Sequence, residues 1–166
     1  MSILITCAAG FIGSNFVLNW LEKNKEKVVA LDKLTYAGNL ENLKFVENKS
    51  NYEFVKGDIG DSDLVAKLLQ EHQPRAIVNF AAESHVDRSI HGPDDFIQTN
   101  IMGTFRLLEE TRSFFNALSD DGKIQFRFLH VSTDEVYGTL SQTDPAFKET
   151  NQYEPCLLYT SDAADD

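Results

Sequence analysis

The chain has 166 residues, of which 42% are hydrophobic and 25% are charged, and its formal net charge is −11. This length and composition are typical of a soluble globular domain with a substantial core. The negative charge disfavours nucleic acid and anionic membranes as partners, because both are bound through basic surfaces. A phosphate ligand stays compatible with the charge, since backbone N–H groups at the start of a helix can hold it.

Cysteine usage and the amino terminus bear on metals and on location. The two cysteines, Cys7 and Cys156, lack metal-ligand spacing and are too few for a disulfide scaffold, so we expect no metal site. The first residues contain neither the basic region nor the long apolar run of a signal peptide or membrane span. A cytoplasmic protein is the resulting expectation.

Short apolar runs alternate with segments of helical period, which is the pattern of parallel βαβ units. The predicted strands are residues 3–6, 28–31, 52–55, 76–80 and 125–132. The predicted helices are residues 11–21, a helix that Asp61 caps and that ends before Pro74, and residues 96–118. The predicted fold class is α/β, a Rossmann-type doubly wound parallel sheet with right-handed crossovers.

The turn between the first strand and the first helix contains Gly10 and Gly13. In a dinucleotide-binding fold, glycines here let the backbone approach the pyrophosphate and let the helix approach the strand. Asp32 follows the second strand, where a carboxylate accepts hydrogen bonds from the adenosine ribose and repels a 2′-phosphate. The combination predicts NAD rather than NADP. The alternative is that the glycines only pack the helix and that Asp32 is a solvated loop acid.

This turn resembles that of the extended short-chain dehydrogenase/reductase superfamily. The superfamily usually has Thr-Gly-Gly-Ala-Gly-Phe-Ile-Gly, and residues 6–13 match it except at Cys7 and Ala8. If Cys7 needs a positive φ, its side chain costs on the order of 1 kcal/mol, and its β-carbon crowds the pyrophosphate. We therefore expect weaker NAD binding than in a Cys7→Gly, Ala8→Gly variant.

Longer segments are similar to the dTDP-glucose 4,6-dehydratase family of that superfamily, namely residues 32–40, 57–59, 80–89 and 99–104. The resemblance implies that residues 32–40 follow the second strand and that residues 57–59 contact the edge of the adenine. It also implies that residues 80–89 line the phosphates and the sugar-binding floor, and that residues 99–104 belong to a helix behind the nicotinamide. The implied NAD contacts are Gly10, Phe11, Ile12, Gly13, Asp32, Lys33, Leu34, Thr35, Asp58, Ile59, Phe80, Ala81, Ala82, Ser84 and Thr99. Taken singly, Asp58 could simply end a strand, and His85, Asp87 and Arg88 could form a surface charge cluster.

Residues 132–138 follow the fifth predicted strand, so their side chains are expected at the carboxyl edge of the sheet. The resemblance implies that Asp134 is the catalytic acid, that Glu135 is the base, and that Thr133 holds the 4-hydroxyl of a hexose. Ser84 and Thr133 are the implied substrate contacts. Paired carboxylates can divide acid and base roles when their pKa values differ.

The implied reaction converts dTDP-glucose to dTDP-4-keto-6-deoxyglucose and water. Bound NAD accepts a hydride from C4, water is eliminated across C5 and C6, and the hydride returns to C6, so NAD is regenerated. Related epimerases usually have a serine-rich stretch without an acid pair. The pair Asp134-Glu135 therefore favours a dehydratase over an epimerase or decarboxylase of the same superfamily.

The resemblance ends after Pro155. Tyr159 falls in the register of the family's catalytic tyrosine, but Ala163 stands where the family has a lysine that lowers the tyrosine pKa. Without that cation, Tyr159 is expected to titrate near the ordinary phenol value of about 10. We therefore expect residues 156–166 to be foreign sequence.

The expected organisation is an NAD-binding domain over residues 1–155, incomplete before the substrate-binding portion. The resemblance implies a homodimer for the full-length family member, and uncovered apolar surface predicts self-association of a truncated sheet. An inactive NAD-binding fragment is the interpretation from outside the enzyme class.

Overall fold

The computed structural model describes residues 1–83, 93–141 and 143–154. Five parallel strands form one sheet in the order β3-β2-β1-β4-β5. The chain adds β2 and β3 on one side of β1 and then β4 and β5 on the other side. This strand order confirms the predicted Rossmann-type doubly wound sheet. The strands are β1 (Ser2–Thr6), β2 (Lys27–Asp32), β3 (Tyr52–Lys56), β4 (Ala76–Asn79) and β5 (Arg127–His130).

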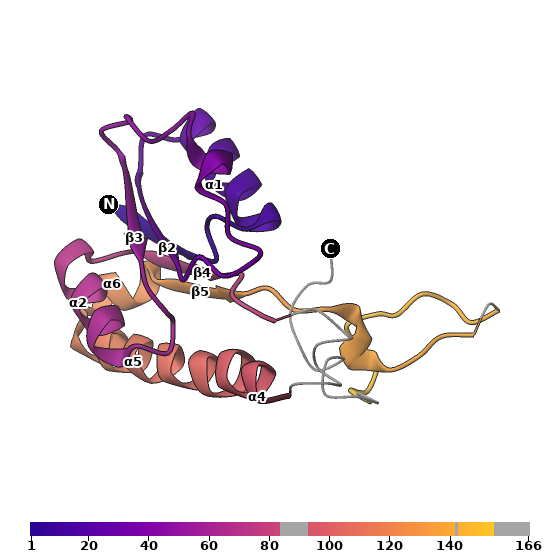
Figure 1. The fold of residues 1–166 in the computed structure, drawn as a ribbon. Coiled ribbons are helices and arrows are strands. Elements are labelled where there is room, and N and C mark those ends of the chain that lie inside the picture. The colour runs from indigo at the N-terminus through magenta and orange to yellow at the C-terminus, as the bar shows by residue number, and fades with distance from the viewer. Residues whose placement is uncertain (84–92, 142, 155–166) are drawn as a thin grey trace.

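Helices cover both faces of this sheet (Figure 1). The helix α1 lies on one face, and α2 and α5 lie on the other. Among the described residues, no helix combines the length and apolar character that a membrane crossing needs. The helical elements are α1 (Phe11–Lys23), η1 (Leu40–Leu43), α2 (Ser62–His72), α4 (Pro93–Phe96), η2 (Ile97–Gly103), α5 (Thr104–Ala117), α6 (Asp120–Gln125) and η3 (Asp134–Tyr137).

Alternate residues of each central strand point into two separate cores, as the pleat of a strand requires. Ile3 and Ile5 of β1 pack toward α1, whereas Leu4 between them packs toward α2 and α5. Val29 of β2 and Ile77 of β4 join the second core. Because both faces are buried, these strands are continuously apolar in sequence, which is why their positions could be predicted.

Two elements differ from the prediction. The fifth strand covers only Arg127–His130, because Gln125 belongs to the helix α6, which the sequence analysis missed. Ser119 caps α6 by accepting a hydrogen bond from the Gly122 N–H, and acidic residues occupy the first turn. The long helix begins at Pro93 instead of residue 96, and its segment Ile97–Gly103 is a π-helix rather than an α-helix.

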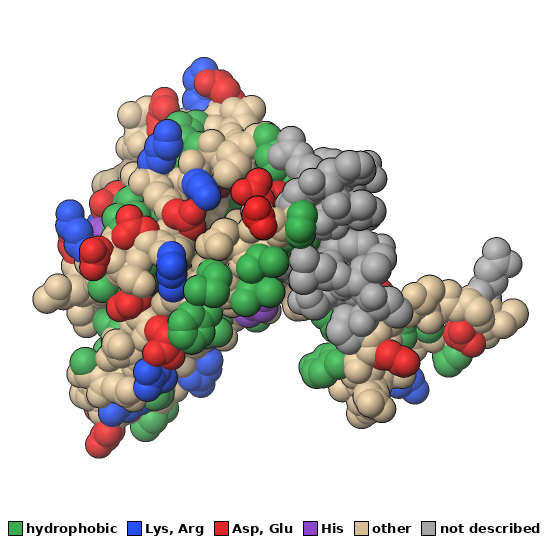
Figure 2. All heavy atoms as spheres, turned by 60° about the horizontal axis from the view of Figure 1, so that its bottom comes forward, with side chains coloured by type: hydrophobic (Ala, Val, Ile, Leu, Met, Phe, Trp, Pro, Cys, Tyr) green, Lys and Arg blue, Asp and Glu red, His purple; other side chains and the backbone are tan. Residues whose placement is uncertain are grey.

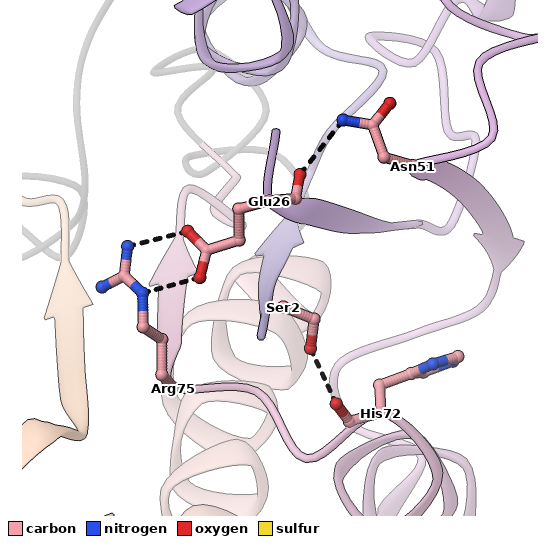
Figure 3. Close-up of polar contacts among 5 residues, drawn as sticks. All are labelled: Ser2, Glu26, Asn51, His72 and Arg75. Atoms are coloured by element: carbon pink, nitrogen blue, oxygen red, sulfur yellow. Dashed lines mark hydrogen bonds and ion pairs between the residues drawn. The ribbon is translucent and has the colours of Figure 1, made fainter. Parts of the chain in front are cut away.

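Polar contacts close the amino edge of the sheet (Figure 3). Arg75, just before β4, donates two hydrogen bonds to the Glu26 carboxylate at 2.6 and 2.8 Å, and Asn51 donates to the Glu26 carbonyl at 3.3 Å. The Ser2 hydroxyl donates to the His72 carbonyl at 2.7 Å, which ties β1 to the end of α2. These hydrogen bonds join neighbouring elements at the amino edge, so their role is structural.

Asp61 supplies a test of the helix α2. Its carboxylate accepts a hydrogen bond from the Leu64 N–H at 3.0 Å, as the sequence predicted for a cap. We expect Asp61→Ala to lower the free energy of unfolding by about 1 kcal/mol, because one backbone N–H loses its partner. Asp63→Ala, an exposed substitution in the same turn, is the control and should cost only a few tenths of that value, about 0.3 kcal/mol. Urea denaturation measures both, and equal losses in the two variants would contradict the capping role.

Candidate cofactor and catalytic site

A cavity of about 220 Å³ opens at the carboxyl edge of the sheet, beside the point between β1 and β4 where the strand order reverses. Parallel sheets bind ligands at this position because loops from opposite sides diverge there. We call it the cofactor cavity. It is lined by Cys7, Leu31, Asp32, Lys33, Thr35, Tyr36, Gly57, Asp58, Ile59, Ala81, Ala82, Glu83, Asp95 and Thr99.

Eight of the predicted nucleotide contacts lie around this one cavity, although they come from four separate segments of the chain. They are Asp32, Lys33, Thr35, Asp58, Ile59, Ala81, Ala82 and Thr99. The structure therefore brings together the loops after β2, β3 and β4 and the helix that begins at Pro93. A ligand that fills this space contacts all of them at once.

The turn between β1 and α1 is as tight as its glycines suggested. A β-carbon at Gly13 would lie 2.1 Å from the Cys7 carbonyl oxygen, so only glycine lets α1 pack this closely on the end of β1. Cys7 adopts a φ of 47°, which confirms the suspected positive φ at a position where relatives of the superfamily usually have glycine. Cys7 also lines the cofactor cavity.

Asp32 connects this turn to the loop after β2. Its side chain is almost fully buried, and its two carboxylate oxygens accept hydrogen bonds from the Ala9 N–H at 2.8 Å and the Leu34 N–H at 2.7 Å. The alternative of a solvated loop acid is therefore wrong. Each oxygen has accepted one backbone hydrogen bond, so lone pairs remain for hydroxyl groups of a ligand in the cavity.

A second carboxylate, that of Asp58, lines the cavity together with Lys33. The Lys33 Nζ lies 2.8 Å from Asp58 Oδ2, and the Gly60 N–H donates to Asp58 Oδ1 at 2.8 Å. Burial opposes ionisation of Asp58, but these contacts outweigh it and lower the pKa of its carboxyl. The hydrogen bond to Asp58 in turn raises the pKa of Lys33. Both groups are therefore charged at neutral pH, and they form a partly exposed ion pair in the cavity lining.

Buried polar groups hold the end of β4 against β1. The Thr6 hydroxyl donates to Asn79 Oδ1 at 2.5 Å and accepts from the Phe80 and Ala81 N–H groups at 3.1 and 3.2 Å. The Asn79 side-chain amide also donates to His130 Nδ1 at 2.9 Å, which links β4 to β5. Sequence reasoning missed Asn79, although a polar residue closing an apolar strand was a visible signal.

Several predicted contacts do not line the cofactor cavity. Gly10 is the amino-terminal cap of α1, Phe11, Ile12 and Gly13 form its first turn, and Leu34 packs on the α1 core. The Phe80 ring packs against Phe16, at 5.4 Å between ring centroids, and is a core residue here. Ser84 lies outside the described residues. Conversely, Tyr36 and Asp95 line the cavity without having been predicted as contacts, and so does Glu83, which was predicted only as part of the segment 80–89.

The predicted catalytic segment forms a second cavity beyond the carboxyl end of β5. Thr133 is the amino-terminal cap of η3, and its hydroxyl accepts from the Glu135 N–H at 3.3 Å. The Tyr137 ring stacks on Tyr153, with ring centroids 5.3 Å apart, and makes a tilted contact with Phe147, with centroids 5.4 Å apart. We call this the β5 cavity. It is lined by Ser132, Thr133, Asp134, Val136, Tyr137, Phe147, Lys148, Glu149 and Tyr153.

The two cavities lie at the same edge of the sheet, because β4 and β5 are parallel neighbours. No described residue lines both of them, and the partly buried Glu135 lines neither. In Figure 1 the segment after β5 extends away from the sheet. Tyr159 and Ala163 lie outside the described residues. A nicotinamide held beside Thr133, Asp134 and Glu135 is thus still a prediction.

A sequence profile of the GDP-mannose 4,6 dehydratase family matches residues 4–161. The chain belongs to this family. Among curated members, the dTDP-glucose 4,6-dehydratase of Xanthomonas campestris pv. campestris (strain B100) is 58% identical over 161 residues, which is 97% of this chain and 45% of that protein. The chain thus spans about half the length of the curated relatives it matches.

Solved structures agree with this family membership. The dTDP-glucose 4,6-dehydratase DesIV of Streptomyces venezuelae, crystallised with NAD, is 42% identical, with a TM-score of 0.84 over 96% of this chain and 47% of that one. A UDP-glucose 4-epimerase of Thermotoga maritima is 29% identical, with a TM-score of 0.78 over 96% of this chain and 47% of that one. The family member described here therefore shares its fold with dehydratases and epimerases, and is more similar in sequence to the former.

The strained turn of this family member gives a stability prediction. We expect Cys7→Gly to raise the free energy of unfolding by up to about 1 kcal/mol, because glycine has no β-carbon penalty at a φ of 47°. Ala8→Gly is the matched control, since the neighbouring buried Ala8 has no positive φ. That change should destabilise the protein by about 0.5–1 kcal/mol. Denaturant unfolding measures the free energy of unfolding of both variants. A destabilised Cys7→Gly protein would show that φ strain at Cys7 is not the dominant effect.

Proposed function

We propose that this chain forms the NAD-binding part of a dTDP-glucose 4,6-dehydratase. The observation that carries the proposal is the cofactor cavity, in which the buried Asp32 carboxylate and the Lys33–Asp58 pair occupy the positions that the resemblance assigned to ribose and adenine contacts. The 58% identity to a dTDP-glucose 4,6-dehydratase supports the same assignment. The activity, substrate and partners of the whole protein follow from this proposal.

The residues around the cavity fit NAD. Asp32 has lone pairs for the ribose hydroxyls of an adenosine, and the small side chains of Ala81 and Ala82 leave room after β4. Asp32, Asp58, Glu83 and Asp95 outnumber Lys33, so the cavity is acidic. An acidic cavity repels the 2′-phosphate of NADP more than the hydroxyl of NAD, which favours NAD.

The chemistry proposed for the protein's own residues is proton transfer and positioning. Asp134 protonates the departing C6 hydroxyl, Glu135 removes the C5 proton, and Thr133 holds the 4-hydroxyl of the sugar. Bound NAD supplies the reversible hydride transfer. In the structure Thr133 caps η3 through its hydroxyl, and this contact fixes the start of the acidic pair. A hydroxyl that accepts from the Glu135 N–H can still donate to a ligand.

Two other functions stay in competition. An epimerase or decarboxylase of the same superfamily would share the fold and the cofactor cavity, but Asp134-Glu135 supplies an acid and a base that hydride transfer alone does not need. An NAD-binding fragment without turnover is favoured by Cys7 in the strained turn and by Ala163 in place of lysine. Analysis of the reaction product separates these functions, because only a dehydratase eliminates water from the sugar nucleotide.

A homodimer and a cytoplasmic location stay predictions. An exposed apolar stripe supports self-association: Ile97, Ile101, Phe105 and Leu108 recur at helical spacing along η2 and α5. Figure 2 turns this side of the molecule toward the viewer and shows hydrophobic side chains gathered between charged ones. Exposed apolar stripes of this kind mark contact surfaces.

Cofactor preference and turnover test the proposal directly. We expect titration calorimetry to show binding of NAD and at least about tenfold weaker binding of NADP, because one added charge repulsion of about 1.4 kcal/mol gives that factor. Incubation with dTDP-glucose and NAD should yield a 4-keto product lighter by one water, detected by mass spectrometry. NAD binding without product would support the fragment hypothesis, and absence of NAD binding would overturn the proposal.

Glu135 tests the catalytic assignment. In a full-length enzyme that carries this segment, we expect Glu135→Gln to lower kcat by at least about a hundredfold, because the amide cannot accept the C5 proton. The Kd for NAD should not change. Glu71→Gln, an exposed substitution at the end of α2, is the control and should leave both quantities unchanged. Retained turnover in Glu135→Gln would remove Glu135 from the mechanism.

A further inference from the structure

A hydrogen bond crosses the cofactor cavity between its two walls. The Tyr36 hydroxyl, on the loop after β2, donates to the Glu83 carboxylate, on the loop after β4, at 3.0 Å. Both residues line the cavity. Because β2 and β4 lie on opposite sides of β1, this contact spans the point where the strand order reverses. The two side chains thus bridge the loops after β2 and β4 at the cavity.

Glu83 is held from behind by a residue of the π-helix η2. The Glu83 N–H donates to Asn100 Oδ1 at 2.8 Å, and the Asn100 side-chain amide donates to the Glu83 carbonyl at 3.0 Å. This pair of contacts satisfies both backbone groups of one residue. A π-helix has a wider turn than an α-helix, and such turns often occur where a helix presents a side chain for function. Thr99, the preceding residue, lines the same cavity.

The contacts differ in exposure, and this difference defines what can move. The Asn100 pair is partly buried, whereas the Tyr36–Glu83 hydrogen bond is exposed and the Tyr36 side chain is half exposed. An exposed hydrogen bond contributes little to stability because water competes for both groups. The Glu83 backbone is therefore fixed, while the bond between the two side chains can open and close.

We propose that Tyr36, Glu83 and Asn100 form a latch that retains the nucleotide in the cofactor cavity. This inference rests on the proposed function, namely NAD binding at this site. Tyr36 and Glu83 are the moving parts, and Asn100 is a positioning residue that holds the Glu83 backbone. Retention suits the proposed reaction, because a hydride that returns to the product leaves the cofactor ready for the next cycle without exchange.

Release of bound NADH measures the latch. The protein is loaded with NADH and mixed with excess NAD, and the loss of NADH fluorescence gives the dissociation rate. We expect roughly fivefold faster release from Tyr36→Phe, which loses one exposed hydrogen bond. Glu83→Gln should stay within about twofold of the unsubstituted protein, because the amide oxygen still accepts from the Tyr36 hydroxyl.

Two further variants separate the latch from independent contacts. Tyr36→Phe combined with Glu83→Ala should release NADH no faster than the faster single variant, since both remove the same bond. Asn100→Ala should accelerate release as well. Gln98→Ala, an exposed change in the same π-helix, is the control and should not. The melting temperatures of Tyr36→Phe, Glu83→Gln and the double variant should stay close to that of the unsubstituted protein, because the contact they change is exposed, and this excludes general unfolding as the cause of faster release.

The outcomes distinguish the latch from the proposed function. If the unsubstituted protein binds no NADH, the proposed function and the latch both fail. If it binds NADH but Tyr36→Phe releases it at the same rate, or if the effects of Tyr36→Phe and Glu83→Ala multiply, the latch alone is overturned. Accelerated release in Tyr36→Phe, with near-normal release in Glu83→Gln and non-multiplying effects in the double variant, supports it.

Discussion

The close contact between α1 and the end of β1 is the constraint on which the candidate site depends. A β-carbon at Gly13 would meet the Cys7 carbonyl at 2.1 Å, so α1 sits directly on the turn. This position sends the Ala9 N–H toward Asp32, whose carboxylate then also holds the Leu34 N–H. A wider turn would separate the backbone from this carboxylate, and the loop after β2 would lose the contact that places Lys33 beside Asp58.

In a parallel sheet, the positions of the strands and the edge that carries the site can be predicted from sequence. The central strands are buried on both faces, so their apolar runs located β1, β2 and β4 to within about a residue, and the spacing from Gly10 to Asp32 pointed to two parts of the candidate site. The carboxyl ends of parallel strands meet at one edge, which explains why residues far apart in sequence, such as Asp32 and Thr99, line one cavity.

Features set by tertiary contacts escaped the sequence. The helix α6 is short and polar, with no buried residue, and has no hydrophobic period to reveal it; only the Ser119 cap and its acidic first turn marked the position. The π-helix η2 carries the same apolar spacing as an α-helix over a few residues, so periodicity could not distinguish them. Phe80 was expected beside the cofactor because residues 80–89 resemble a segment of the family, yet its ring packs in the α1 core, and a strand end does not reveal which of the two faces its side chain takes.

Asp32 performs two tasks that are usually discussed apart. In the proposed function its charge opposes a phosphorylated ribose, while in the structure its oxygens anchor two backbone amides in a buried turn. Redesign of the cofactor preference by the common route of replacing this acid with a small neutral residue would therefore leave the Ala9 and Leu34 amides without acceptors, at about 1–3 kcal/mol each. In this scaffold a change of cofactor would have to begin with a new acceptor for those amides, because selectivity and the integrity of the turn reside in the same side chain.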